Sequence, residues 1–148
     1  MNSPLTTFVV LLALVVCVRP EIFPASQTRF RLHGKVSCPL DQWWCYRVVV
    51  YERDGIKWDV IDHVGVKCVR RGDMAYDLDG VQFGGDGLFD KFYEVEVWIT
   101  HNCTTDGHIE AIKRVEQPIS TSETDVRLID WYVNVLTVKG LQVFSYFL

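Results

Sequence analysis

The sequence lacks the patterns that define several protein classes. It has no heptad repeat, no low-complexity tract and no internal repeat, which excludes coiled coils and solenoid arrays. It has no excess of positive charge, because the formal net charge of its 148 residues is −4, so nucleic acid is not an expected partner. Its apolar run at residues 8–18 is shorter than the ~20 residues of a transmembrane helix.

That apolar run predicts a secretory signal peptide over residues 1–18. It follows a short polar lead, as in secretory signals, although this lead contains no lysine or arginine. A retained membrane anchor is the alternative. Residues 19–148 then suit one domain with one core. We therefore expect a secreted, extracellular protein.

Four of the five cysteines lie outside the expected signal peptide. In an oxidising compartment this even number predicts two disulfides, and four cysteines allow three pairings. Cys38 and Cys103 both end a strand pattern on its apolar side, which favours their pairing. The four residues are Cys38, Cys45, Cys68 and Cys103.

Alternating apolar and polar residues predict two well-defined strands. In residues 92–104, the odd positions from Tyr93 to Cys103 form the expected buried face. In residues 30–38, the even positions are apolar and the odd positions are mostly basic. Gly34 interrupts the apolar face, which indicates a bulge or a close neighbour.

Shorter segments complete an all-β pattern. Residues 109–116 fit a weak strand or a short helix, and residues 39–44 and 118–125 are expected to be loops. Seven or eight short strands at this spacing predict a β-sandwich. The remaining strands are expected over 45–53, 64–69, 81–83, 131–139 and 141–148.

Four short motifs follow one another along the chain. They are residues 32–38 (LHGKVSC), 48–54 (VVVYERD), 77–83 (DLDGVQF) and 101–103 (HNC). In order and spacing this set resembles the nematode transthyretin-like family. The resemblance implies a disulfide-stapled sandwich of immunoglobulin-like or transthyretin-like type. Asn134, where the family has glycine in a late strand, departs from the pattern.

The resemblance also bears on disulfide pairing. The family often has a cysteine soon after the H-D/N-C motif and a partner near the C-terminus, and both are absent here. This joint absence implies that Cys38–Cys103 is the family bridge. Cys45–Cys68 is then a second bridge particular to this chain.

A secreted binding protein is the function that the resemblance implies. Family members are extracellular, and some recognise exposed phospholipid, so an extracellular protein or an anionic lipid surface is the expected partner. A carrier of a small hydrophobic ligand, with a pocket formed on oligomerisation, is the first alternative. A hydroxyisourate hydrolase is the second, although residues 143–148 lack the Tyr-Arg-Gly-Ser ending of that branch. We expect no enzyme activity and no cofactor.

The basic face of the strand at 30–38 is the candidate ligand-binding surface. Successive side chains on one strand face lie about 7 Å apart, so several cations can contact anionic headgroups together. A solvated strand face is the alternative. The candidate residues are Arg29, Arg31, His33 and Lys35.

Other motifs predict no metal or catalytic site. The four histidines lack the spacing of zinc ligands, and no G-x-S-x-G sequence is present. His101 is expected to be a buried, hydrogen-bonded structural residue. Asn102 opens an N-glycosylation acceptor pattern, with low occupancy expected because Cys103 enters a disulfide. Turn chemistry, rather than calcium binding, accounts for Asp77, Asp79, Asp86 and Asp90.

Overall fold

The computed structural model describes residues 27–54, 57–83, 91–122 and 126–142. The expected signal peptide, Asp86, Asp90 and residues 143–148 lie outside these ranges. The described residues form eight strands, and within them no helix is long and apolar enough to cross a membrane. The strands are β1 (Gln27–Asp54), β2 (Lys57–Phe83), β3 (Phe92–Tyr93), β4 (Val95–His101), β5 (Glu110–Val115), β6 (Ile119–Ser120), β7 (Val126–Asn134) and β8 (Leu141–Gln142).

The main sheet has the strand order β2-β1-β4-β5-β8, and β7 pairs with the other side of the first part of β1. The β1–β7 pairing is parallel, whereas the other pairings of this sheet are antiparallel. A second sheet consists of β3 and β6. The all-β class expected from the sequence is confirmed.

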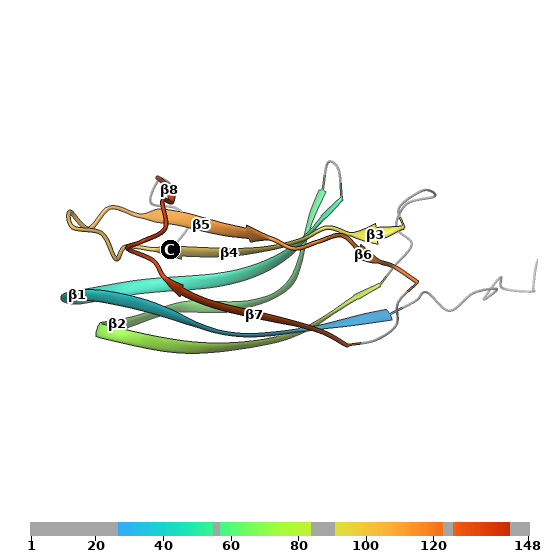
Figure 1. The fold of residues 1–148 in the computed structure, drawn as a ribbon, viewed down its shortest axis with the longest axis horizontal. Coiled ribbons are helices and arrows are strands. Elements are labelled where there is room, and N and C mark those ends of the chain that lie inside the picture. Colours follow the sequence, from blue (N-terminus) through green and yellow to red (C-terminus); the bar gives the residue numbers. More distant parts are fainter. Residues whose placement is uncertain (1–26, 55–56, 84–90, 123–125, 143–148) are drawn as a thin grey trace, which may run out of the picture.

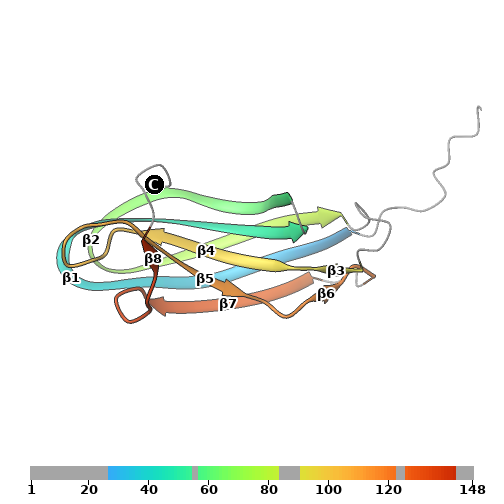
Figure 2. The same ribbon diagram turned by 90° about the horizontal axis from the view of Figure 1, so that it is seen from above.

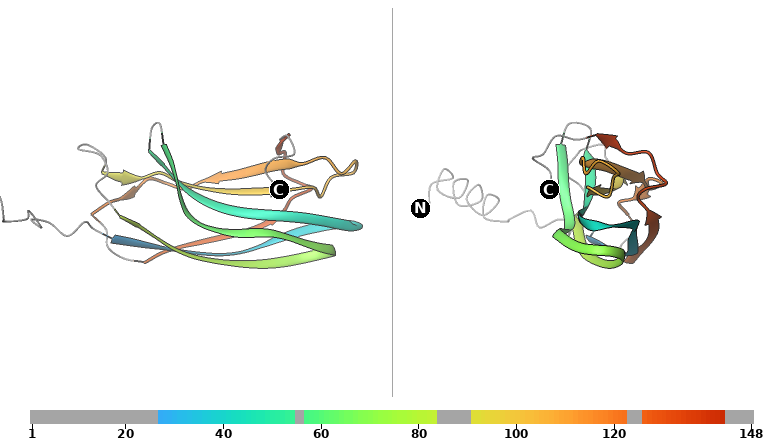
Figure 3. Two further views of the ribbon diagram at one scale, coloured as in Figure 1. Left: turned by 180° about the vertical axis from the view of Figure 1, so that it is seen from behind. Right: turned by 90° about the vertical axis from the view of Figure 1, so that its left-hand side faces the viewer.

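The two long strands, β1 and β2, form one hairpin, and this hairpin folds back on itself halfway along its length (Figure 1). The β1–β2 register is interrupted between Cys38 and Trp43, and β2 bends at Arg71 and Gly72, whose φ angles are 52° and 106°. Figure 3 shows both bends at the same end of the molecule. Gly72 suits this bend because glycine adopts positive φ without a steric penalty.

Bending the hairpin creates two layers, which Figure 2 shows from above. The β7 layer contains residues 27–38 of β1, residues 72–83 of β2, and β7. The β4 layer contains residues 43–54 of β1, residues 57–70 of β2, β4, β5 and β8. One strand pair thus contributes to both layers.

The core lies between the layers and follows the predicted alternation. The even positions from Phe30 to Cys38 are buried in β1, and the odd positions from Tyr93 to Cys103 are buried in and around β4. Phe30 packs edge-on against Tyr93, with ring centroids 5.5 Å apart. Other core residues are Leu32, Tyr46, Val48, Leu78, Val97, Ile99, Ile112 and Ile129.

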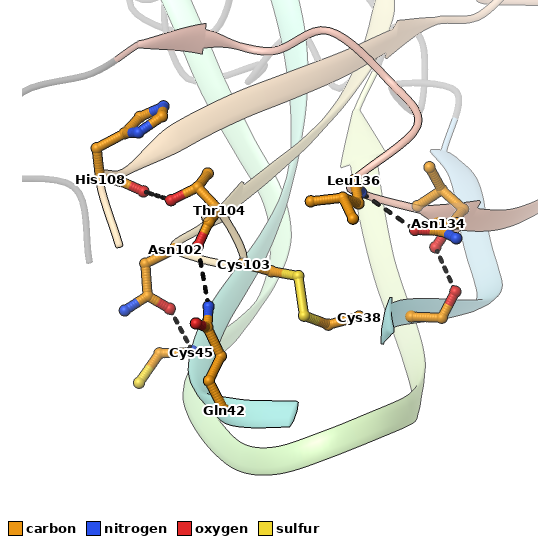
Figure 4. The surroundings of a disulfide bond; sticks show 11 residues. Cys38, Gln42, Cys45, Asn102, Cys103, Thr104, His108, Asn134 and Leu136 are labelled. Carbon is orange, nitrogen blue, oxygen red and sulfur yellow. Dashed lines mark hydrogen bonds between the residues drawn. A yellow bond between two sulfur atoms is a disulfide. The ribbon is translucent and has the colours of Figure 1, made fainter. Parts of the chain in front are cut away.

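Both expected disulfides are present. Cys38–Cys103 joins the end of the first part of β1 to the segment after β4, and so connects the two layers (Figure 4). Cys45–Cys68 joins directly paired residues of β1 and β2, whose Cα atoms are 4.0 Å apart. The first bridge links the two layers through the core, whereas the second links two neighbouring strands of the same layer.

Gly34 has the close neighbours that its place in the apolar face predicted. A Cβ atom there would lie 2.3 Å from the carbonyl oxygen of Trp131 and 2.3 Å from the ring of Tyr76. The Tyr76 hydroxyl donates a hydrogen bond to the same carbonyl oxygen at 3.0 Å. Glycine therefore lets β2, β1 and β7 approach closely.

Several predicted boundaries were wrong. Residues 39–44 are part of β1 rather than a loop, because the strand bends without ending, and β6 lies within the loop expected at 118–125. The helix alternative for 109–116 is also wrong, since β5 pairs with β4. The strand expected at 131–139 is β7, at 126–134. It ends where Asn134 accepts hydrogen bonds from the amides of Leu136 and Thr137, which closes a turn.

Candidate ligand-binding site

The predicted basic row lies on the outer face of the β7 layer. Its four side chains are 43–50% exposed, as expected for a solvent-facing strand surface. They are Arg29, Arg31, His33 and Lys35, which share one parity of β1.

An acidic row on β2 runs beside these side chains, and the sequence analysis did not anticipate it. Asp79 lies 2.5 Å from Arg29 Nε and 3.3 Å from Arg31 Nε. His33 Nδ1 lies 2.5 Å from Asp77, and Lys35 Nζ lies 2.7 Å from Asp73. Each member of the basic row therefore has a carboxylate partner, which weakens its attraction for an anionic surface. The hydrogen bond to Asp79 raises the pKa of Arg29, and the same bond lowers the pKa of Asp79.

An apolar pocket lies on the outer face of the β4 layer. Its volume is about 360 Å³, within the range of small-molecule sites. Strand alternation brings its walls together, because odd positions of β1 and even positions of β4 point outward on the same face. β1 contributes Arg47, Val49 and Tyr51, and the other strands contribute Trp58, Trp98, Thr100 and Ala111.

Three aromatic rings line this pocket as a connected row. The rings of Tyr51 and Trp58 have centroids 5.4 Å apart and planes at 78°. The rings of Trp58 and Trp98 have centroids 5.7 Å apart and planes at 65°. Edge-to-face contacts of this kind stabilise aromatic pairs beyond their apolar area. The rings therefore form a preformed apolar wall.

Glu96 fixes the position of Trp98. Its carboxylate is buried, although the alternation of residues 92–104 predicted an outward polar residue. Trp98 Nε1 donates a hydrogen bond to Glu96 Oε2 at 2.9 Å. Arg53 Nη1 lies 3.5 Å from Glu96 Oε1, and Lys113 Nζ lies 3.4 Å from Oε2. Two cations thus compensate the buried carboxylate, as a buried charge requires.

The same two cations lie over the aromatic rings. Arg53 is 5.7 Å from the centroid of the Trp58 ring, and Lys113 is 5.4 Å from that of Trp98. These distances are within the range of cation–π attraction. Arg47, the cation that lines the pocket itself, has no such carboxylate partner, because it contacts no acidic side chain in the ranges that the structure describes.

A smaller pocket of about 150 Å³ lies beside the Cys38–Cys103 bridge. Its wall includes Thr104, whose hydroxyl donates a hydrogen bond to the carbonyl oxygen of His108 (Figure 4). The two ring nitrogens of His108 contact Asp106 and, at 2.6 Å, Glu110 Oε1. These carboxylates raise the pKa of His108.

His101 is buried as predicted, but the expected hydrogen bond is missing. Neither ring nitrogen has a hydrogen-bond partner in the described part of the chain. Burial lowers the pKa of His101 to about 4. A neutral imidazole therefore occupies this core position at physiological pH.

The acceptor asparagine is held by backbone contacts at the end of β4. Asn102 Oδ1 accepts a hydrogen bond from the Cys45 amide at 2.7 Å (Figure 4). The backbone N–H of Asn102 in turn donates a hydrogen bond to the Cys45 carbonyl oxygen at 3.2 Å. The side-chain carbonyl oxygen of the glycosylation-acceptor asparagine is therefore hydrogen-bonded to β1.

No three His, Cys, Asp or Glu residues of the described ranges are grouped so that they could hold a metal ion. The turn expected at Asp77 and Asp79 was wrong, because both residues lie within β2, where their side chains contact the basic row.

The aromatic pocket was missed because its residues come from four strands. Two signals pointed toward it. Trp98 is an apolar exception on the polar side of its strand, and residues 45–53 are partly apolar on both faces, which predicts a strand covered on both sides. Neither signal indicates which strands contribute to the same wall.

The fold and the pocket define an all-β, disulfide-bonded protein with an aromatic surface site. Residues 33–141 match the model of the family described as "Caenorhabditis elegans protein of unknown function (DUF870)", and the chain belongs to this family. The matched range contains the four bridged cysteines and every described residue that lines the aromatic pocket.

One relative is the "Uncharacterized protein B0416.7" of Caenorhabditis elegans. It is 33% identical over 78 residues, which cover 53% of this chain and 58% of the relative. The chain thus matches little more than half the length of this curated relative. No solved structure matches the chain significantly.

Proposed function

We propose that the protein is a secreted, extracellular binding protein that carries a small apolar ligand in the aromatic pocket of the β4 layer. The row of Tyr51, Trp58 and Trp98 is the observation that carries this proposal. Pockets lined by aromatic side chains with a few polar groups are typical of small-molecule sites. Glu96 holds Trp98 in place before any ligand arrives, which reduces the entropic cost of binding.

The fold component of this proposal is a sandwich of immunoglobulin-like or transthyretin-like type. Two packed layers and the interlayer bridge Cys38–Cys103 support it. The order of the sequence motifs supports the transthyretin-like variant in particular.

Binding is favoured over catalysis by the chemistry of the lining. The seven described lining residues offer apolar walls, one guanidinium and two hydroxyl groups. They include no acid–base pair of the kind that hydrolysis requires. The hydrolase alternative thus gains no support from this pocket.

The aromatic pocket is also favoured over the basic row of the β7 layer. Every member of that row contacts an aspartate of β2, so anionic lipid would compete with existing contacts. Exposed ion pairs of this kind are individually weak, but together they neutralise the surface.

Fluorescence titration with the uncharged apolar probe N-phenylnaphthylamine tests the proposal. We expect saturable binding at one site and about tenfold weaker binding in Trp98→Ala, because the variant loses apolar contact area. Trp43→Ala is the matched control, since Trp43 is 69% exposed and lies outside the pocket. Circular dichroism checks that both variants fold. Non-saturable binding, or an equal loss in the two variants, would contradict the proposal.

A further inference from the structure

We infer that the ligand of the aromatic pocket is an amphiphilic monocarboxylate, whose carboxylate pairs with Arg47 and whose apolar body packs along Trp98 and Trp58. This inference rests on the proposed function and specifies the class of ligand.

Arg47 is the cation that remains available in this pocket. Arg53 and Lys113 share the buried carboxylate of Glu96 and lie over the indole rings. Arg47 lines the pocket without an acidic partner among the described residues. The seven lining residues that the structure describes include no carboxylate. An anionic group is therefore the complement that this wall lacks.

The sheet separates the polar and apolar ends of the pocket. Arg47 pairs with Thr100 across β1 and β4, and Thr100 pairs with the small residue Ala111 on β5. The hydroxyl of Thr100 adds a second polar group at this end of the described lining, and Ala111 adds little side-chain bulk beside it.

The aromatic end lies farther along the same strands. Val49 pairs with Trp98, and Arg53, at the end of β1, pairs with Trp58. At about 3.3 Å per residue, the distance from position 47 to position 51 is about 13 Å. A ligand with a terminal carboxylate and an unbranched apolar body fits this polarity and length.

Arginine suits this role for a chemical reason. Its planar guanidinium donates two parallel hydrogen bonds to a carboxylate, and charge-assisted bonds are stronger than neutral ones. A partly buried site strengthens them further, because the aromatic wall limits solvent screening. An uncharged amphiphile of equal length gains only the apolar contacts.

Competition against bound N-phenylnaphthylamine tests the inference with dodecanoate, dodecanol and dodecylamine. We expect dodecanoate to bind at least about tenfold more tightly than dodecanol. Dodecylamine should bind most weakly of the three, because its ammonium group is repelled by Arg47. In Arg47→Gln the advantage of dodecanoate over dodecanol disappears, because the neutral amide of glutamine carries no charge to pair with the carboxylate. Arg47→Lys keeps part of the advantage, because it retains the charge without the planar fork.

Arg31→Gln is the matched control. It removes the same charge from the outer face of the β7 layer, where Arg31 makes a 3.3 Å contact with Asp79, and it leaves the preference for dodecanoate intact. Equal binding of dodecanoate and dodecanol to the wild-type protein overturns the inference but leaves the proposed function standing. Failure of all three amphiphiles and of the probe to bind overturns both.

A final arm separates a free amphiphile from a lipid headgroup. Sedimentation with phosphatidylglycerol vesicles is expected to show no binding that depends on Arg47. Vesicle binding that is lost in Arg47→Gln, without a preference for dodecanoate, overturns the inference in favour of a membrane surface.

Discussion

His101 is expected to make the stability of this protein fall as the pH falls below neutrality. Its side chain is fully buried in β4, and its ring nitrogens have no hydrogen-bond partner in the described part of the chain. Burial lowers its pKa to about 4 from the usual 6.5. Between these values the unfolded chain binds a proton that the folded protein excludes, so acid favours unfolding.

The size of this effect follows from the two pKa values. The contribution of His101 is fully present above pH 6.5, is lost as the pH falls, and is exhausted near pH 4. One pH unit corresponds to about 1.36 kcal/mol, which gives a loss of about 1.5 kcal/mol between pH 6.5 and 5.

Other perturbed groups act mainly outside this pH window. Hydrogen bonds to Glu110 and Asp106 raise the pKa of His108, so the stabilising contribution of His108 is fully present below pH 6.5 and is lost as the pH rises through its folded pKa. The lowered pKa values of Asp79 and Asp106 stabilise the fold above their unfolded pKa, and this contribution is lost at lower pH. Among the described groups with shifted pKa values, His101 is therefore the one whose contribution to stability falls between pH 6.5 and 5.

Urea unfolding followed by tryptophan fluorescence at pH 6.5 and 5 measures this loss. We expect the wild-type protein and the surface control His63→Gln to lose about 1.5 kcal/mol, and His101→Phe to lose much less. Equal pH dependence in His101→Phe and wild type would refute the reasoning. If His101→Phe does not fold, NMR titration of the wild-type imidazole serves instead, and a midpoint above pH 6 contradicts the lowered pKa.

Three further predictions concern the backbone, the bridges and the surface. Gly34→Ala should destabilise the fold by about 2 kcal/mol through overpacking, whereas Gly65→Ala, which has open space around its Cβ position, should change stability by less than about 0.5 kcal/mol in the same urea assay. Replacing both cysteines by alanine should cost about 4 kcal/mol for Cys38–Cys103 and about 3 kcal/mol for Cys45–Cys68, because the first closes the longer loop; the reverse order in urea unfolding would contradict the loop-entropy argument. Intact-mass spectra of the protein expressed through a eukaryotic secretory pathway should show Asn102 partly glycosylated or unmodified, since its side chain contacts the Cys45 amide; full occupancy would contradict this.

Sequence alternation alone determined which face of several strands is buried. The pattern from Phe30 to Cys38 and the pattern from Tyr93 to Cys103 both predicted the core side correctly. Because both patterns deliver a cysteine to that side, the interlayer disulfide was also predictable. Gly34 was recognisable for the same reason, as a gap in an otherwise apolar face. These features depend on a local period of two residues.

The tertiary structure decided which strands lie beside one another. The bend at residues 39–42 and 71–72 folds one hairpin into two layers, and no local pattern marks it as a bend rather than a loop. The β1–β2 register places Asp79 beside Arg29, which turns the expected cationic face into a row of ion pairs. Pairing of β1, β2, β4 and β5 builds the aromatic pocket in the same way. Alternation specifies the side on which a residue lies, but the neighbour across the strand depends on long-range register, which a local pattern does not encode.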